Sequence, residues 1–150
     1  MKTKASNIMI ALVLVCILLA QPAPALATPP EPLTITADLY LNGPNSASGD
    51  FNASGDLFTD AGSASEVFFI ADGTIHGVKT LVGAKGTITI RFQAQLTWTG
   101  PTTGIAEGRF VIVSGTGDYE KLHGVGETYA ELNLGTGNIL ASYTGTAHID

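Results

Sequence analysis

The sequence has one cysteine and few positively charged residues. Cys16 lies within the apolar run of residues 8–20, so the rest of the chain has no thiol for a disulfide, a thiolate metal site or a nucleophile. Lysine and arginine together number 7, against 13 aspartate and glutamate residues. A chain with this balance repels nucleic acid and anionic surfaces, so we expect no nucleic-acid partner.

The first 27 residues predict a secretory signal peptide. Lys2 and Lys4 precede the apolar run, and Ala25-Leu26-Ala27 follows it as an A-x-A cleavage site. The run is about 13 residues long, whereas a membrane-spanning helix needs about 20, which favours cleavage after Ala27 over an uncleaved anchor. We therefore expect a secreted or periplasmic protein with no membrane attachment after cleavage. Its mature part has five basic and thirteen acidic residues, a net charge of −8.

The mature chain also lacks a sustained apolar period of 3.6 residues, the pattern of an amphipathic helix. Residues 28–32 (TPPEP) predict a proline-rich tether, and residues 33–41 and 87–98 alternate apolar and polar side chains, which predicts half-buried strands. Further strands are expected at 66–70, 74–82, 107–114, 127–134 and 139–149. Residues 33–150 thus predict one all-β domain, a single antiparallel barrel of about eight strands, with a sandwich as the alternative.

The second half of the chain resembles a known family. The segments GTITIRFQAQLTW and GRFVIVSGTGDYEKLHGVGE, with a last hairpin ending SYTGTAH, are similar to bacterial exported proteins of the allene-oxide-cyclase-like (dirigent-like) β-barrel group. The resemblance covers roughly residues 60–148. It implies a barrel with a tight, partly helical crossover at 115–126, and relatives that bind small hydrophobic molecules in the barrel. The catalytic residues of those relatives have no match here, so the resemblance assigns none.

These observations favour a non-catalytic protein that binds a small hydrophobic molecule inside the barrel. Two alternatives stay open: a barrel filled by its own side chains that acts through its surface, and an isomerase or cyclase with Glu107 and Arg109 inside. We expect Arg91 to face water, because the apolar residues of its strand face inward. The sequence also fits a homo-oligomer. The candidate ligand-binding residues are large side chains expected on inward faces or at a lid: Phe92, Trp98, Phe110, Tyr119 (with Leu122) and Tyr143.

One segment has the spacing of oxygen ligands in a calcium loop. Asp50, Asn52, Ser54 and Asp56 alternate along a glycine-containing repeat. Position twelve of that loop is Ala61, where a bidentate glutamate is expected, so a polar surface hairpin is the alternative interpretation. We expect no other cofactor.

The three histidines lie on separate segments. No two of His76, His123 and His148 are spaced as neighbouring zinc ligands are, so we expect isolated histidines at the surface or the barrel rim. The sequence also has no P-loop, no dinucleotide-binding motif and no Ser-His-Asp arrangement. These patterns favour a protein that is not an enzyme.

Overall fold

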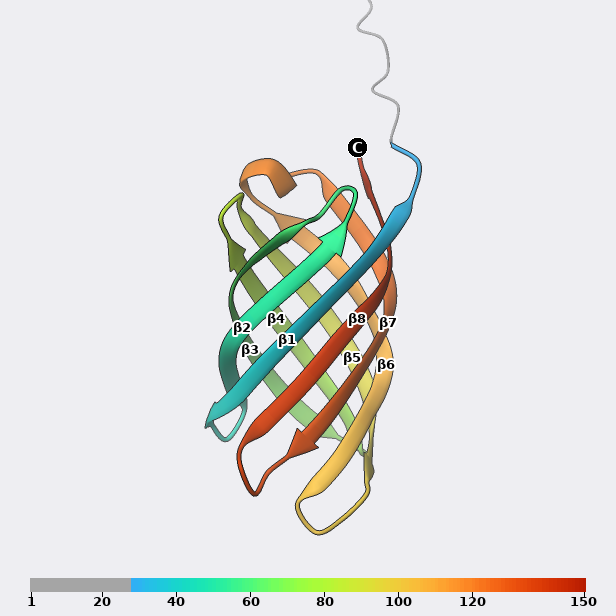
Figure 1. Cartoon of the computed structure of the whole chain (residues 1–150). Coiled ribbons are helices and arrows are strands. Elements are labelled where there is room, and N and C mark those ends of the chain that lie inside the picture. The colour runs from blue at the N-terminus through green and yellow to red at the C-terminus, as the bar shows by residue number, and fades with distance from the viewer. Residues whose placement is uncertain (1–27) are drawn as a thin grey trace, which may run out of the picture.

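The fold is a closed barrel of eight antiparallel strands (Figure 1). The computed structural model describes residues 28–150, so the expected signal peptide lies outside the described residues. Each strand pairs with the next one along the chain, and β8 returns to pair with β1, so the predicted barrel is confirmed. The strands are β1 (Glu31–Gly43), β2 (Ser46–Gly55), β3 (Asp60–Ala71), β4 (Thr74–Gly83), β5 (Thr87–Trp98), β6 (Thr103–Gly115), β7 (Leu122–Asn133) and β8 (Asn138–Ile149).

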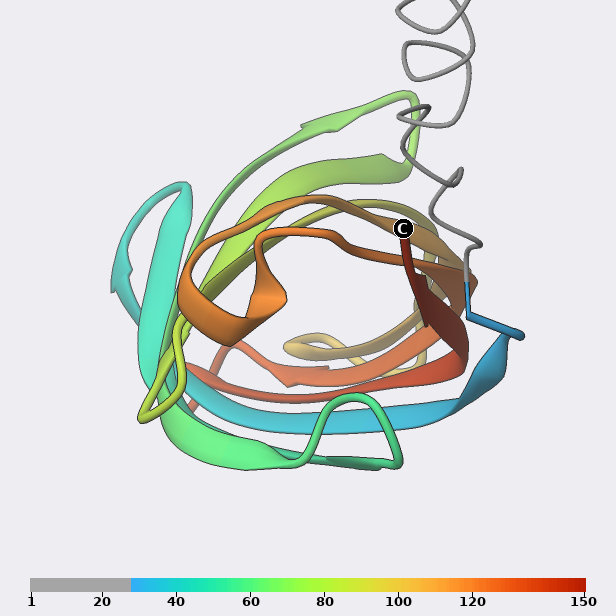
Figure 2. The same ribbon diagram turned by 90° about the horizontal axis from the view of Figure 1, so that it is seen from above.

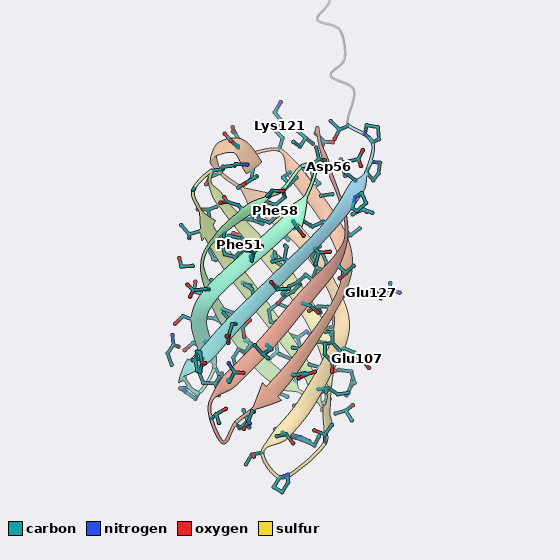
Figure 3. All side chains as sticks on the ribbon, in the orientation of Figure 1. Phe51, Asp56, Phe58, Glu107, Lys121 and Glu127 are labelled. Atoms are coloured by element: carbon teal, nitrogen blue, oxygen red, sulfur yellow. The ribbon has the colours of Figure 1, made fainter. Side chains whose placement is uncertain are left out.

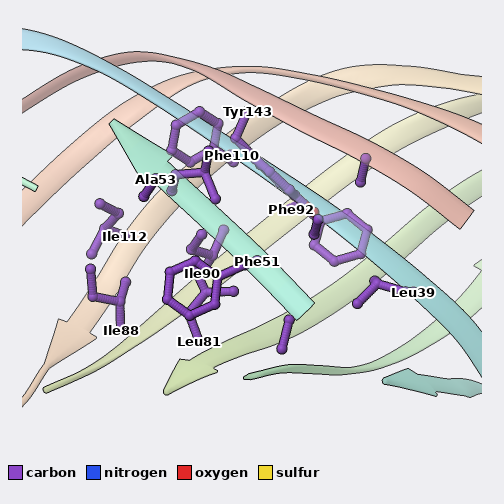
Figure 4. Packing of buried hydrophobic residues seen from close by; sticks show 14 of the residues in the cluster. Leu39, Phe51, Ala53, Leu81, Ile88, Ile90, Phe92, Phe110, Ile112 and Tyr143 are labelled. Carbon is purple, nitrogen blue, oxygen red and sulfur yellow. The ribbon is translucent and has the colours of Figure 1, made fainter. Parts of the chain in front are cut away.

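Inward side chains fill the barrel. Strict alternation places Leu33, Ile35, Ala37 and Leu39 of β1 at 4% exposure or less, while the residues that alternate with them face water. Figure 4 shows aliphatic and aromatic side chains from strands around the ring, Phe51 and Ile90 among them, meeting in the interior. An eight-stranded barrel has an interior just wide enough for side chains to fill, which matches this packing.

Aromatic rings occupy space that glycine leaves free. Phe92 pairs with Gly77 across β4 and β5, and a Cβ atom on Gly77 would overlap the Phe92 ring. The rings of Phe92 and Phe110 both meet Tyr143 edge to face, with centroid distances of 6.3 and 5.3 Å. These three aromatic side chains are buried, as the sequence predicted.

The link between β6 and β7 covers one end of the barrel. It contains the 3-10 helix η1 (Gly117–Tyr119), in which Gly117 has a φ of 63°, a conformation that favours glycine. The Tyr119 ring packs against Phe58 with the ring centroids 4.8 Å apart, and Tyr119 and Leu122 are both buried. Figure 2 shows η1 over this end of the barrel. The link joins adjacent antiparallel strands and is therefore not a crossover. None of the described residues belongs to a helix with the length and hydropathy needed to span a bilayer.

The carboxylate of Asp60 connects three segments at the η1 end of the barrel through hydrogen bonds. It accepts hydrogen bonds from the backbone N–H groups of Ala84 (3.2 Å) and Lys85 (3.1 Å) and from the hydroxyl of Tyr119 (2.9 Å). Desolvation acts to raise the pKa of Asp60, but the hydrogen bonds outweigh it and hold the pKa below its usual value. One side chain thus joins the start of β3, the β4–β5 turn and η1.

Two segments differ from the expectation. Trp98, expected inside, is 53% exposed, because it is the last residue of β5 and lies beyond Leu96, the last buried residue of that strand. The segment from Asp50 to Asp56, for which a polar surface hairpin was the alternative interpretation, lies mostly in the long strand β2, which pairs with both β1 and β3. β2 turns Phe51 and Ala53 into the core.

Candidate functional site

An open groove of about 1150 Å³ lies on the outside of the barrel. It is lined by the tip of the β1–β2 hairpin at residues 44–46 and by four consecutive strands, β3 to β6, at residues 67–69, 76–78, 91–93 and 109–111. In the view down the barrel, the tips of the β1–β2 and β3–β4 hairpins extend beyond the ring of strands (Figure 2). The groove therefore combines segments that are distant in sequence and adjacent in the sheet. We call it the outer groove.

Exposed valines form one row of the outer groove. Val67 pairs with Val78, Val78 with Arg91, and Arg91 with Val111, so the row crosses all four strands. The three valines are 62%, 38% and 36% exposed, respectively. Clustered apolar side chains that remain open to water indicate a binding surface.

The neighbouring row adds an aromatic pair and a second arginine. It runs from Phe69 through His76 and Gln93 to Arg109. The Phe69 and His76 rings stack with their centroids 5.0 Å apart and their planes at 13°. Phe69 is 56% exposed, so the stacked pair presents an apolar face to solvent.

The charged residues of β5 and β6 face water. Arg91 is exposed, as predicted. Glu107 and Arg109 are also exposed on the outer face, so the alternative that placed this pair inside the barrel is wrong; Figure 3 shows Glu107 projecting outward. The reason is the inward placement of Ala106 and Phe110, which fixes the opposite face for Glu107 and Arg109.

A different charged pair lies inside the barrel. Glu66 of β3 and Lys79 of β4 are directly opposite in register, and their side chains form an ion pair with Nζ 3.1 Å from Oε2. The Lys79 side chain is 0% exposed and that of Glu66 is 5% exposed. The Lys79 ammonium also lies 4.9 Å from the centroid of the Tyr143 ring, a cation–π contact.

The buried ammonium is incompletely satisfied. Glu66 is within ion-pair distance, but no acceptor in residues 28–150 is aligned to take a hydrogen bond from Lys79 Nζ. Desolvation lowers the pKa of Lys79, while Tyr143 and Glu66 raise it by more, so its pKa lies above the usual value. Burial raises the pKa of Tyr143. Lys79 therefore stays protonated, and Tyr143 neutral, at neutral pH.

The interior has little free space beside these groups. A cavity of about 30 Å³ is lined by Glu66, Thr128 and Tyr143 together with apolar side chains. A cavity of this size holds one or two water molecules. The buried polar residues thus have no room for an organic substrate beside them and act in the packing of the barrel.

The residues proposed as calcium ligands lie on and beyond β2. Asp50, Asn52 and Ser54 point outward from one extended strand, and Asp56 follows the end of that strand. Alternate residues of a strand are about 6.6 Å apart, so the strand does not wrap these oxygens around one point as a calcium loop does. Within residues 28–150, no group of three or more His, Cys, Asp or Glu side chains is arranged to hold a metal ion. Calcium binding stays a prediction.

Two of the three histidines lie together, contrary to the expectation of isolated ones. His123 of β7 and His148 of β8 are cross-strand partners, and their rings stack at 5.4 Å. Each Nε2 atom lies near the carboxylate of Asp150, at 3.2 and 3.4 Å, respectively. The pairing depends on the β7–β8 register, which the spacing of histidines along the chain does not contain.

Sequence reasoning missed the outer groove and the buried ion pair for different reasons. A signal for the ion pair exists: Lys79 alternates in phase with Ile75 and Leu81, which places it on the inward face of β4. The groove has no comparable signal, because its two rows form only when four strands are aligned in register.

No protein-family model, curated protein or solved structure matches this chain. Membership of the allene-oxide-cyclase-like group therefore stays a prediction.

Proposed function

We propose that this protein is a non-catalytic binding protein that carries its ligand on the outside of a filled barrel. The observation that carries the proposal is the contrast between about 1150 Å³ in the outer groove and about 30 Å³ in the interior cavity. Ligand pockets in proteins commonly measure about 300–1000 Å³ and are lined by apolar side chains with a few polar groups. The groove is slightly larger than this range and has this lining, whereas the cavity is about tenfold smaller than the lower limit.

Binding inside the barrel has less support. A cavity of about 150 Å³ admits a benzene ring in a protein core, which is several times the space beside Tyr143. A larger hydrophobic molecule would have to displace core side chains such as Phe92 and Phe110. A cyclase reaction in the barrel would meet the same lack of space, and its polar groups, Glu66 and Lys79, are already paired with each other.

The proposal is tested with Nile red, a neutral dye that becomes fluorescent in apolar surroundings. We expect saturable binding to the purified protein, and an increase in the dissociation constant of at least about tenfold in Val78→Asp, because the new carboxylate must be desolvated under the dye. The matched control is Val82→Asp, on the same face of β4 and 49% exposed, but outside the groove. It should bind like the unmodified protein.

Equal weakening by both substitutions would contradict the outer site, since Val82 does not line the groove. Absence of saturable binding in the unmodified protein would contradict the binding function itself.

A further inference from the structure

The charged residues that line the outer groove are both arginines, although the chain as a whole is acidic. Arg91 and Arg109, which both line it, are the only arginines in the chain. Among residues 28–150, neither forms a salt bridge, although Glu127 is opposite Arg109 in the register of β6 and β7. No acidic residue lines the groove, yet the mature chain carries a net charge of −8.

The two arginines are placed to act on one group. Arg91 pairs with Val111 and Arg109 pairs with Gln93, so the arginines are diagonal neighbours on adjacent strands. Diagonal residues on a sheet have Cβ atoms about 7–8 Å apart, within reach of long side chains. Arginine side chains that start this close together are long enough to bring both guanidinium groups to one carboxylate, phosphate or sulfate, for which arginine has matching donor geometry.

The apolar part of the groove starts beside these arginines. Val78 and Val111 flank Arg91 in its row, and the stacked Phe69 and His76 rings occupy the β3–β4 end of the row that ends at Arg109. A molecule that spans the groove would therefore meet cationic side chains on β5 and β6 and apolar side chains toward β3.

We propose that the outer groove selects a small amphipathic anion, with its charged group held by Arg91 and Arg109 and its apolar body on Val67, Val78 and Phe69. This inference rests on the proposed binding function and adds the ligand class. A free molecule is favoured over a bilayer surface because an overall charge of −8 opposes approach to an anionic membrane.

The test compares decanoate with decanol, which share an alkyl chain and differ in charge, as competitors of Nile red at neutral pH. We expect decanoate to displace the dye at a concentration at least about tenfold lower than decanol, because hydrogen bonds to charged groups are the stronger class. Arg91→Gln and Arg109→Gln should each reduce this preference and leave decanol competition unchanged.

Matched controls remove the same charge elsewhere. The control variants are Lys85→Gln and Lys121→Gln. Both lysines lie at the η1 end of the barrel, away from the β1–β2 hairpin tip (Figure 3 labels Lys121). Both should keep the full preference for decanoate. If they reduce it as much as the arginine variants do, overall charge and not the groove sets the preference, and the inference fails.

Other outcomes separate this inference from the function on which it rests. Equal displacement by decanoate and decanol, with both weakened by Val78→Asp, would overturn the anion preference and keep the binding function. No displacement by either ligand, together with no saturable dye binding, would contradict the function as well. Arginine-dependent sedimentation with phosphatidylglycerol vesicles, without competition by free decanoate, would replace a small ligand by a membrane surface.

Discussion

The ion pair between Glu66 and Lys79 gives the sharpest prediction about stability. Glu66→Gln removes the countercharge of an ammonium that is 0% exposed and lacks an aligned hydrogen-bond acceptor among the described residues. Breaking a buried ion pair on one side costs about 3–5 kcal/mol. The cation–π contact with Tyr143 is present in both the unmodified protein and this variant, so it does not change the difference between them. We therefore expect a loss of about 3–5 kcal/mol in the free energy of unfolding.

The double variant Glu66→Leu/Lys79→Met provides the decisive comparison. Leucine and methionine have similar volumes to the residues they replace and carry no charge, so neither leaves an unpaired group in the barrel. Replacing both members of a buried pair by apolar residues is often neutral or stabilising. We expect the double variant to unfold at a higher urea concentration than either of its component single variants, Glu66→Leu and Lys79→Met.

Urea denaturation followed by far-ultraviolet circular dichroism measures both effects. The comparison requires that the slope of the free energy of unfolding against urea concentration is the same in all variants. Domains of this size are stable by about 5–15 kcal/mol, so the single variants remain measurable or are visibly unfolded. Additive losses, with the double variant least stable of all, would refute the reasoning, because they would mean that the two groups do not depend on each other.

Two further predictions concern the hydrogen bonds of Asp60 and the titration of Lys79 and Tyr143. Asp60→Asn weakens the hydrogen bonds from Ala84, Lys85 and Tyr119, and should lower the free energy of unfolding by about 1 kcal/mol, measured in the same urea experiment. An unchanged free energy of unfolding would mean that the Asp60 carboxylate does not stabilise the η1 end of the barrel. Raising the pH should also destabilise the barrel. The folded-state pKa of Lys79 is raised above 10.5 and that of Tyr143 above 10.0, so the stability that these groups contribute is present below those values and is lost as the pH rises through the folded-state pKa values. The thermal midpoint of unfolding, measured between about pH 9 and 12, tests this prediction. If the midpoint of Glu66→Leu/Lys79→Met falls as steeply with rising pH as that of the unmodified protein, Lys79 is not the source of the pH dependence.

The strands that were best predicted are those with the cleanest alternation. β1 and β5 carry apolar residues on one face and polar residues on the other, so their inward faces were assigned correctly, except for Trp98 at the end of β5. β2 was underestimated because its inward positions include Ala47, Gly49 and Ala53, which are too small to stand out from the serines between them. A narrow barrel needs such small residues, and they hide the period on which strand prediction depends.

The candidate site was less predictable than the fold for a physical reason. Alternation assigns a face to each residue, and it placed Arg91 outside correctly. It does not say which outward residues become neighbours, because that depends on the register of every strand pair from β3 to β6. The groove is a product of that register, and so is the contact between His123 and His148.

The most direct test of the account is to locate the bound ligand. Intermolecular nuclear Overhauser effects between Nile red and assigned methyl groups of the protein distinguish the two faces of the sheet. The account predicts contacts to Val67, Val78 and Val111 and none to the core methyl groups of Ile90 and Ile112, which are at most 2% exposed. Contacts to Ile90 and Ile112 without contacts to the valines would contradict it and place the ligand inside the barrel.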